Sequence, residues 1–192
     1  METAVVFILS YLLGAINTAD ILGRIKKIDI TKMGTGNAGA KNVARVLGTK
    51  WGYFVGVVDF LKGAIVSFFA RKNPFFLIFA CIGVLAGHNW SIFMKFKGGS
   101  GLAIASGICF ALMPVATFFA YFVGLVVGLF AAKFLPLGKF APYDVSAISG
   151  WLLLLGIAFF NSNYFPALFA LGFPVLFKRI IFLSSKNNKM TK

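Results

Sequence analysis

The stretch MGTGNAGAKNVARVLG, residues 33–48, is polar, basic and rich in glycine, and a second such stretch, GHNWSIFMKFKGGSGLA, follows at residues 87–103. Both lie between long apolar segments in a chain whose mean hydropathy is +0.89. Glycine lets backbone N–H groups converge on an oxyanion, and nearby Lys and Arg side chains supply positive charge. The two stretches predict an anion site at the surface of a membrane.

The composition is typical of an integral membrane protein. Of the 192 residues, 59% are hydrophobic and only 12% are charged, whereas about a quarter of the residues in a soluble domain are charged. The net charge of +14 lies in short connectors, where it can set orientation and hold anionic headgroups or an anionic substrate. A nucleic-acid partner is not expected, because duplex binding requires a continuous basic face.

Six apolar segments are long enough to enter or cross a hydrocarbon layer of ~30 Å. They are residues 4–23, 51–70, 74–93, 102–132, 145–160 and 164–177. The fourth is too long for one span and contains Met113-Pro114, where proline removes a backbone donor and breaks the helix. Splitting it gives about seven transmembrane or half-membrane helices, and a kinked single span is the alternative. We expect an all-α integral membrane protein in one polytopic domain, residues 1–192.

The distribution of basic residues predicts the orientation. After the first apolar segment the connector carries an excess of them: Arg24, Lys26, Lys27, Lys32, Lys41, Arg45 and Lys50. Cytoplasmic loops are enriched in Lys and Arg, so we expect this connector inside and the N-terminus outside. With seven segments, the basic tail that contains Lys178 and Arg179 also falls in the cytoplasm, whereas Arg71 and Lys72 fall outside. The first segment lacks the basic start of a cleavable signal peptide, so we expect it to remain as a membrane helix.

In the first glycine-rich stretch, Gly34, Gly36 and Gly39 match the dinucleotide pattern G-x-G-x-x-G. That pattern needs a buried strand before it, and residues 28–30 are too few to supply one. What remains is a glycine-rich turn that leads into a helix, with Thr35 and Asn37 available for hydrogen bonds.

Lys41 and Arg45 follow this turn and share one helical face because of their i, i+4 spacing. The planar guanidinium of Arg45 suits bidentate contact with a phosphate. The alternative is that these two side chains only face lipid headgroups.

The second stretch contains Lys97-Gly98-Gly99-Ser100-Gly101, which is not a Walker A loop because the lysine precedes the glycines. Its glycines, followed by small residues, predict a backbone nest for an anion at the start of a helix. His88 is the single histidine and comes nine residues before Lys97. Acceptance of a proton and orientation of the loop are both open roles for His88.

A few other polar residues lie within apolar segments. Asp59 and Lys62, at i, i+3, are expected to form an ion pair within one helix, and a role in the site is the alternative. Asp20 is expected to balance Arg24. The two cysteines lie in apolar runs without the spacing of a metal site, so no metal is expected.

These motifs together resemble the bacterial acyl-phosphate:glycerol-3-phosphate acyltransferase family of small membrane enzymes. The resemblance is carried by GTGNAGAKNVAR (residues 34–45), by Asp59 to Gly63, and by GHNWSIFMKFKGGSG (residues 87–101). The chain departs from the family at Ser100, where the family has lysine, and at Lys41, where it has threonine. The tail FKRIIF (residues 177–182) also lacks the family's histidine and asparagine.

The resemblance implies transfer of a fatty acyl group from acyl phosphate to the 1-hydroxyl of glycerol 3-phosphate, without metal or cofactor. It also implies a multi-pass protein of the bacterial inner membrane whose site faces the cytoplasm. The expected catalytic residues are His88, Arg45 and Lys97. The expected substrate-binding residues are Thr35, Gly36, Asn37, Lys41, Asn42, Gly98, Gly99, Ser100 and Gly101. The amides of Gly36, Gly98 and Gly99 are assigned to oxyanion contacts.

Two other functions remain open, the first of them because of these departures. One is an altered or inactive relative that binds lipid or phosphate. The other is a transporter of a small anion, although few ionisable residues in the later helices offer it a polar route.

Overall fold

A computed structural model describes residues 1–134, 142–161, 164–170 and 172. The α-helices are α1 (Glu2–Ala15), α2 (Thr18–Ile25), α3 (Ala40–Leu47), α4 (Thr49–Ala70), α5 (Pro74–Asn89), α6 (Leu102–Leu112), α7 (Pro114–Phe134) and α8 (Pro142–Asn161). Two short 3₁₀ helices, η1 (Ile30–Lys32) and η2 (Ile92–Met94), lie in the connectors. Residues 165–170 are also helical. The expected all-α architecture is confirmed for the described residues, none of which forms a named strand.

The first apolar segment differs from the expected single helix because it breaks between α1 and α2. The side chain of Asn17 caps α2 by accepting a hydrogen bond from the Asp20 N–H at 2.9 Å. Asparagine is favoured at such a cap and disfavoured inside a helix, which explains why the chain breaks there. Together, Glu2–Ile25 still form one candidate membrane span.

The expected split of residues 102–132 is confirmed. The helix α6 ends at Leu112, and α7 begins at Pro114. At the first position of a helix the backbone N–H has no partner within the helix, so proline loses no hydrogen bond there. The helix expected over the apolar segment 74–93 is shorter than that segment, since α5 ends at Asn89 and the chain then turns through η2. The basic tail and the FKRIIF segment lie outside the described residues.

Three helical segments among the described residues are long and apolar enough to cross a membrane: Glu2–Ile25, Thr49–Ala70 and Pro114–Phe134. Shorter apolar helices cover Pro74–Asn89, Leu102–Leu112 and Ile148–Phe160. Large apolar side chains such as Phe118, Phe122 and Leu129 are exposed along α7. A bilayer is the solvent that such a surface requires.

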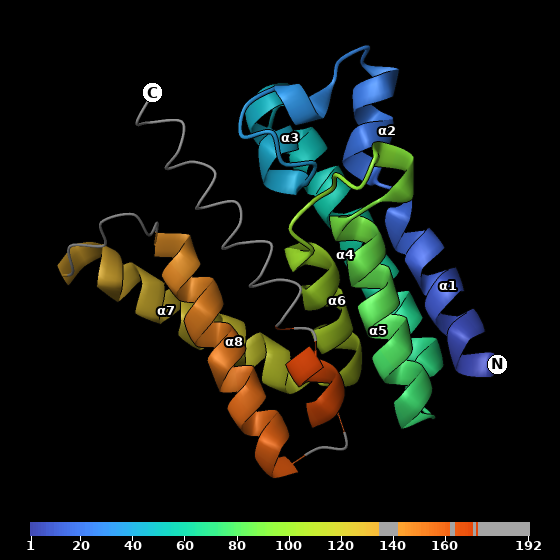
Figure 1. The fold of residues 1–192 in the computed structure, drawn as a ribbon. Helices are drawn as coiled ribbons and strands as arrows, with labels where there is room; N and C mark the ends of the chain where they lie inside the picture. Colours follow the sequence, from blue (N-terminus) through green and yellow to red (C-terminus); the bar gives the residue numbers. More distant parts are fainter. Residues whose placement is uncertain (135–141, 162–163, 171, 173–192) are drawn as a thin grey trace, which may run out of the picture.

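The helices pack in close pairs through small residues. In Figure 1, α1, α4, α5 and α6 run beside one another, with α2 and α3 beyond one end and the crossed pair α7 and α8 on the other side of α6. A Cβ on Gly87 of α5 would collide with the Tyr11 carbonyl of α1, and one on Gly107 of α6 would collide with the Phe60 carbonyl of α4. Close backbone approach at glycine is how membrane helices associate.

The end of the bundle that carries α2 and α3 has its own apolar cluster. Buried Leu22, Ile30, Val43 and Val55 join α2, η1, α3 and α4, and Met94 of η2 packs on them. This cluster fixes the two glycine-rich stretches relative to α4.

Candidate active site

Asn42 shapes the first glycine-rich loop from beneath. Its buried side chain donates from Nδ2 to the carbonyls of Ile30 (3.1 Å) and Met33 (3.0 Å), and its Oδ1 accepts from the Thr35 N–H (2.7 Å). Gly34 has a φ of 57°, and a Cβ there would collide with Asn42 Oδ1. The amide expected to bind substrate is therefore engaged in folding the loop.

The helix α3 begins directly after this loop, as the sequence predicted. Gly39 precedes its first residue, Ala40, and no side chain caps it. The first N–H groups of an uncapped helix lack partners inside the helix and favour an anion. Lys41 and Arg45 are exposed on this helix.

The second loop is a tight turn at the end of α5. The N–H of Ser91 donates to the Lys97 carbonyl at 3.1 Å. The side chain of Lys97 is exposed at the start of the glycine run. A Cβ on Gly98 would collide with the His88 carbonyl, and one on Gly99 would collide with His88 Nε2. Only glycine allows the backbone to pass this close over the end of α5. Ser100, where the chain departs from the family pattern, is partly buried.

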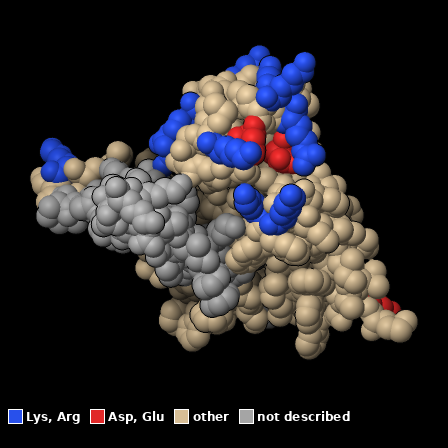
Figure 2. Space-filling model, turned by 45° about the horizontal axis from the view of Figure 1, so that its top comes forward, with Lys and Arg blue, Asp and Glu red and all other residues tan. Residues whose placement is uncertain are grey.

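The two loops touch each other. The Ala38 N–H of the first donates to the Gly98 carbonyl of the second at 3.4 Å, and the Ala38 carbonyl accepts from Asn17 Nδ2 at 3.1 Å. Figure 2 shows most of the visible Lys and Arg side chains at the end of the molecule that carries α2 and α3, with a further group set apart at the left. The structure thus brings together two loops that are about 60 residues apart in the sequence, next to the exposed start of α3.

Two of the three amides assigned to oxyanion contacts need correction. The Gly36 N–H donates to the Met33 carbonyl at 2.9 Å, and the Gly99 N–H donates to the His88 carbonyl at 3.1 Å. Neither is available to a substrate in this arrangement. The amides of Gly98 and Ala40 have no hydrogen-bond partner within residues 1–134 and the later described segments, so they are the better candidates.

His88 lies beneath the loops rather than between them. Its side chain is 4% exposed, its Nε2 lies against Gly99, and its Nδ1 lies 3.9 Å from Asp59 Oδ2. The burial favours the second of the two roles left open by the sequence, orientation of the loop, over direct acceptance of a proton from a substrate.

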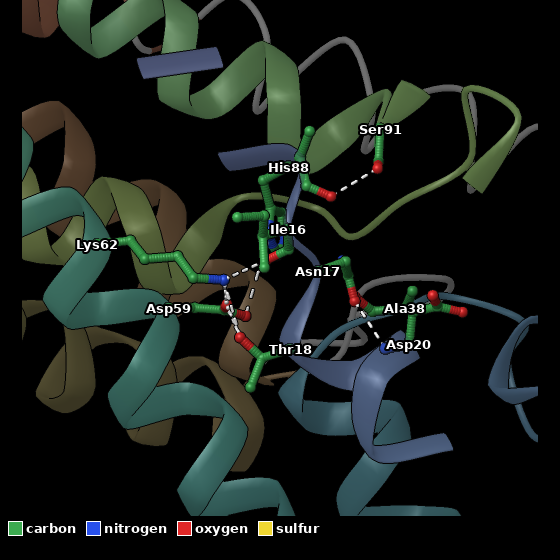
Figure 3. Close-up of polar contacts among 10 residues, drawn as sticks. Ile16, Asn17, Thr18, Asp20, Ala38, Asp59, Lys62, His88 and Ser91 are labelled. Carbon is green, nitrogen blue, oxygen red and sulfur yellow. Dashed lines mark hydrogen bonds and ion pairs between the residues drawn. The ribbon is translucent and has the colours of Figure 1, made fainter. Parts of the chain in front are cut away.

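Asp59 and Lys62 form the expected ion pair, with 3.2 Å between Lys62 Nζ and Asp59 Oδ1. The pair also reaches beyond its own helix, as Figure 3 shows. Thr18 Oγ1 donates to Asp59 Oδ1 at 2.9 Å, and Lys62 Nζ donates to Thr18 Oγ1 and to the Ile16 carbonyl. The pair therefore joins α4 to the break between α1 and α2.

Two carboxylates on the outer side of this end have local partners. The predicted pair of Asp20 and Arg24 is confirmed, with Arg24 Nε 2.8 Å from Asp20 Oδ2. Asp29 begins η1 and accepts from the side chain and then the backbone of Thr31, and these bonds lower the pKa of Asp29 from its ordinary value. The Asp29 carboxylate thus caps the turn that precedes Met33.

Comparison with known sequences decides the family. The sequence model described as "Glycerol-3-phosphate acyltransferase" matches residues 4–189. The chain belongs to this family. It is therefore an acyltransferase and a multi-pass membrane protein.

Relatives of the glycerol-3-phosphate acyltransferase family match most of the chain. The enzyme of Thermoanaerobacter pseudethanolicus is 38% identical over 167 residues, which are 85% of this chain and 80% of that protein. Glycerol-3-phosphate acyltransferase 2 of Moorella thermoacetica is 37% identical over 142 residues, 72% of this chain and 73% of its own length. The crystal structure of PlsY, an integral membrane glycerol 3-phosphate acyltransferase in its glycerol 3-phosphate form, superposes with a TM-score of 0.81. It shares 28% identity over 100% of this chain and 93% of PlsY.

Sequence reasoning on this acyltransferase missed Asn17 and Thr18. Both side chains are buried at the helix break, where Asn17 holds the Ala38 carbonyl and Thr18 bridges Asp59 and Lys62. A signal was present, because two adjacent hydrogen-bonding residues inside an apolar segment are costly unless they find partners. Their partners, Ala38 and the two charged residues of α4, lie 21 or more positions away, so the spacing of neighbouring residues could not predict these contacts.

Proposed function

We propose that this chain transfers a fatty acyl group from acyl phosphate to the 1-hydroxyl of glycerol 3-phosphate, the first acylation in phospholipid synthesis. Family membership supports the acceptor, and PlsY has been solved in glycerol 3-phosphate and lysophosphatidic acid forms. The observation that carries the proposal is the contact between the loops at Ala38 and Gly98. It supports the proposal because the two stretches that carry Arg45 and Lys97 meet there.

The reaction needs two anions held close together. The hydroxyl oxygen of glycerol 3-phosphate attacks the acyl carbon, a new C–O ester bond forms, and the bond from that carbon to the phosphate oxygen breaks. The hydroxyl proton passes to the departing phosphate, so the products are lysophosphatidic acid and inorganic phosphate. Because acyl phosphate is already activated, alignment and stabilisation of the developing oxyanion supply the catalysis.

The exposed cations have the electrostatic role in this proposal. Arg45 and Lys97, one from each loop region, contact the phosphate groups, and Lys41 adds charge on the face of Arg45. The amide of Gly98 and that of Ala40 face the oxyanion. These assignments follow the positive end of α3 and the loop contact described above.

The remaining side chains bind or position. Thr35 and Asn37 offer hydrogen bonds to the acceptor, and Ser100 and Gly101 border the second loop at the start of α6. Asn42 and His88 are positioning residues, because both are buried and engaged beneath the loops. Burial of a side chain under the backbone that it supports is how a site keeps its geometry.

The proposed location is the bacterial inner membrane with the loops at the cytoplasmic face. The support is the concentration of Lys and Arg at the end that carries both loops (Figure 2), as the positive-inside rule requires. Glycerol 3-phosphate, a soluble anion, then meets an acyl donor whose chain lies in the bilayer.

Purified protein with palmitoyl phosphate and glycerol 3-phosphate tests the proposal. We expect equimolar release of phosphate and formation of lysophosphatidic acid, with palmitoyl-CoA as the control donor giving neither phosphate nor product. Product formed from palmitoyl-CoA alone would contradict the assignment of acyl phosphate as the donor. Binding of palmitoyl phosphate without product would identify an inactive relative, and flux of glycerol 3-phosphate into liposomes without product would identify a transporter.

A further inference from the structure

The break between α1 and α2 leaves a backbone carbonyl without its helical donor. In a continuous helix the Ile16 carbonyl would accept from the Asp20 N–H, but that N–H donates to Asn17 Oδ1 instead. The ammonium of Lys62 takes its place and donates to Ile16 O (Figure 3). The contact is partly buried, and a carbonyl left unpaired there is costly, so Lys62 stabilises the broken form of this segment.

Asp59 completes the arrangement on the other side of Lys62. Its side chain is 2% exposed, and its Oδ1 accepts from both Thr18 and Lys62. The three donors of the ammonium therefore meet Ile16 O, Thr18 Oγ1 and Asp59 Oδ1. A simple ion pair that only neutralised two buried charges would not require the two contacts to the helix break.

Each side of this cluster leads to one of the glycine-rich loops. At the break, Asn17 Nδ2 holds the Ala38 carbonyl of the first loop at 3.1 Å. On the other side, Asp59 Oδ2 faces His88 Nδ1, and the ring of His88 supports Gly99 of the second loop. The buried pair is therefore the structural link between the two loops below their direct contact.

We infer that Asp59 and Lys62 are positioning residues that set the spacing of the two loops for the acyl transfer. This inference rests on the proposed function of the loops. The pair does not touch substrate. It acts through Asn17 on one loop and through His88 on the other.

The double variant Asp59→Asn with Lys62→Met tests this inference, because it removes both charges and leaves neither one buried alone. If the pair served only to neutralise itself, this variant would retain wild-type kinetics. If the pair positions the loops, we expect kcat/KM to fall on the order of 10- to 100-fold, as misplacement of a site by about 1 Å does. The KM for glycerol 3-phosphate is expected to rise while kcat also falls.

Ser67→Ala is the matched control. Ser67 is a buried polar residue of the same helix, and its Oγ donates to the Gly63 and Ala64 carbonyls of that helix. Its loss is expected to change thermal stability without changing the KM for glycerol 3-phosphate. Amide hydrogen exchange adds a readout independent of activity. Residues 33–39 and 95–101 should exchange faster than in the wild type in the double variant and at the wild-type rate in Ser67→Ala.

Thr18→Val keeps both charges and covers the case in which the double variant does not fold. It removes the hydroxyl that bridges the pair to α2, and we expect a raised KM for glycerol 3-phosphate and faster exchange in the first loop. Wild-type kinetics and exchange in either folded variant would overturn the inference. A wild-type protein that makes no lysophosphatidic acid would instead refute the proposed function, and the exchange data would still judge the link between the loops.

Discussion

Two helices of this protein, α4 and α7, are alike in length and in the share of residues that they bury, and they differ in which residues these are. They have 22 and 21 residues, both are candidate spans, and 28% of each apolar window is buried. Their window hydropathies are 1.6 and 2.2. The helix α4 buries Asp59, Lys62 and Ser67, whereas α7 buries Thr117 and small residues such as Gly124.

The difference separates two kinds of membrane helix. The polar residues of α4 reach to the α1–α2 break and, through His88, to the second loop. The small residues of α7 allow close contact with α8, where a Cβ on Gly124 would lie 2.5 Å from the Ser146 carbonyl. Length and hydropathy identify both helices as candidate spans, but the buried polar residues of α4 link that helix to the candidate active site.

The largest expected effect on folding is that of Lys62→Ala in α4. It leaves Asp59 charged and buried without its cation, and it leaves the Ile16 carbonyl without a donor. Removal of one partner from a buried pair costs about 3–5 kcal/mol. Thermal unfolding of the purified protein in detergent measures this, and a melting temperature equal to that of the wild type would contradict the importance of the pair.

Arg45→Ala, in the helix that packs on α4, is expected to reduce activity without unfolding the protein, because Arg45 is exposed. Loss of a hydrogen bond to a charged phosphate costs about 1.5–3 kcal/mol in kcat/KM. The matched control is Lys133→Ala, which removes an exposed cation near the end of α7 and should leave the kinetics unchanged. Normal turnover by a folded Arg45→Ala variant would remove Arg45 from the site.

Two glycine variants separate packing from function. A Cβ on Gly63 would collide with the Ile104 carbonyl of α6, and one on Gly124 would meet the Ser146 carbonyl of α8. We expect Gly63→Ala and Gly124→Ala each to destabilise by about 1–3 kcal/mol through overpacking. Only Gly63→Ala should also lower kcat/KM, because α6 follows the second loop directly.

Gly156→Ala is the control for both variants, since nothing lies within 4 Å of a Cβ at Gly156 in α8. Alanine there gains helix propensity, so the melting temperature should rise or stay the same. Equal loss of activity in Gly63→Ala and Gly124→Ala would remove the functional difference between the two helices.

The smallest effect is expected for Thr117→Val in α7. The hydroxyl of Thr117 is buried and has no hydrogen-bond partner among the residues that the structure describes. An unpaired buried hydroxyl is itself costly, so its replacement by an apolar group of similar shape should leave the unfolding free energy unchanged or raise it. A large loss of stability would show that α7 also contains a polar contact of consequence.

The sequence predicted those features of the fold that depend on local residue chemistry. Pro114 marked the end of α6, and the glycine-rich turn before Lys41 marked the start of α3. Runs of apolar residues also marked the membrane helices, although three helical segments among the described residues, and not six, are long enough to cross a membrane. These signals are local, since they follow from a missing N–H, a positive φ or a run of apolar side chains.

The features that sequence reasoning missed depend on partners far along the chain. Spacing of i, i+3 predicts that Asp59 meets Lys62, but nothing local indicates that Lys62 also reaches Ile16. The family resemblance placed Asn42 among the substrate-binding residues, and only the positions of Ile30 and Met33 show how its amide is used. Likewise, the burial of His88 follows from the path of Gly99 over it.

The dependence of Ile16 on Lys62, 46 positions later, has a consequence for the order of events during synthesis. When the first segment emerges from the ribosome, the helix that supplies its donor does not yet exist. Before α4 is present, the donor that the segment itself offers to the Ile16 carbonyl is the Asp20 N–H of a continuous helix. We therefore expect the first segment to enter the bilayer as a continuous helix and to break at Ile16 once α4 lies beside it; cross-linking of stalled nascent chains would test this order.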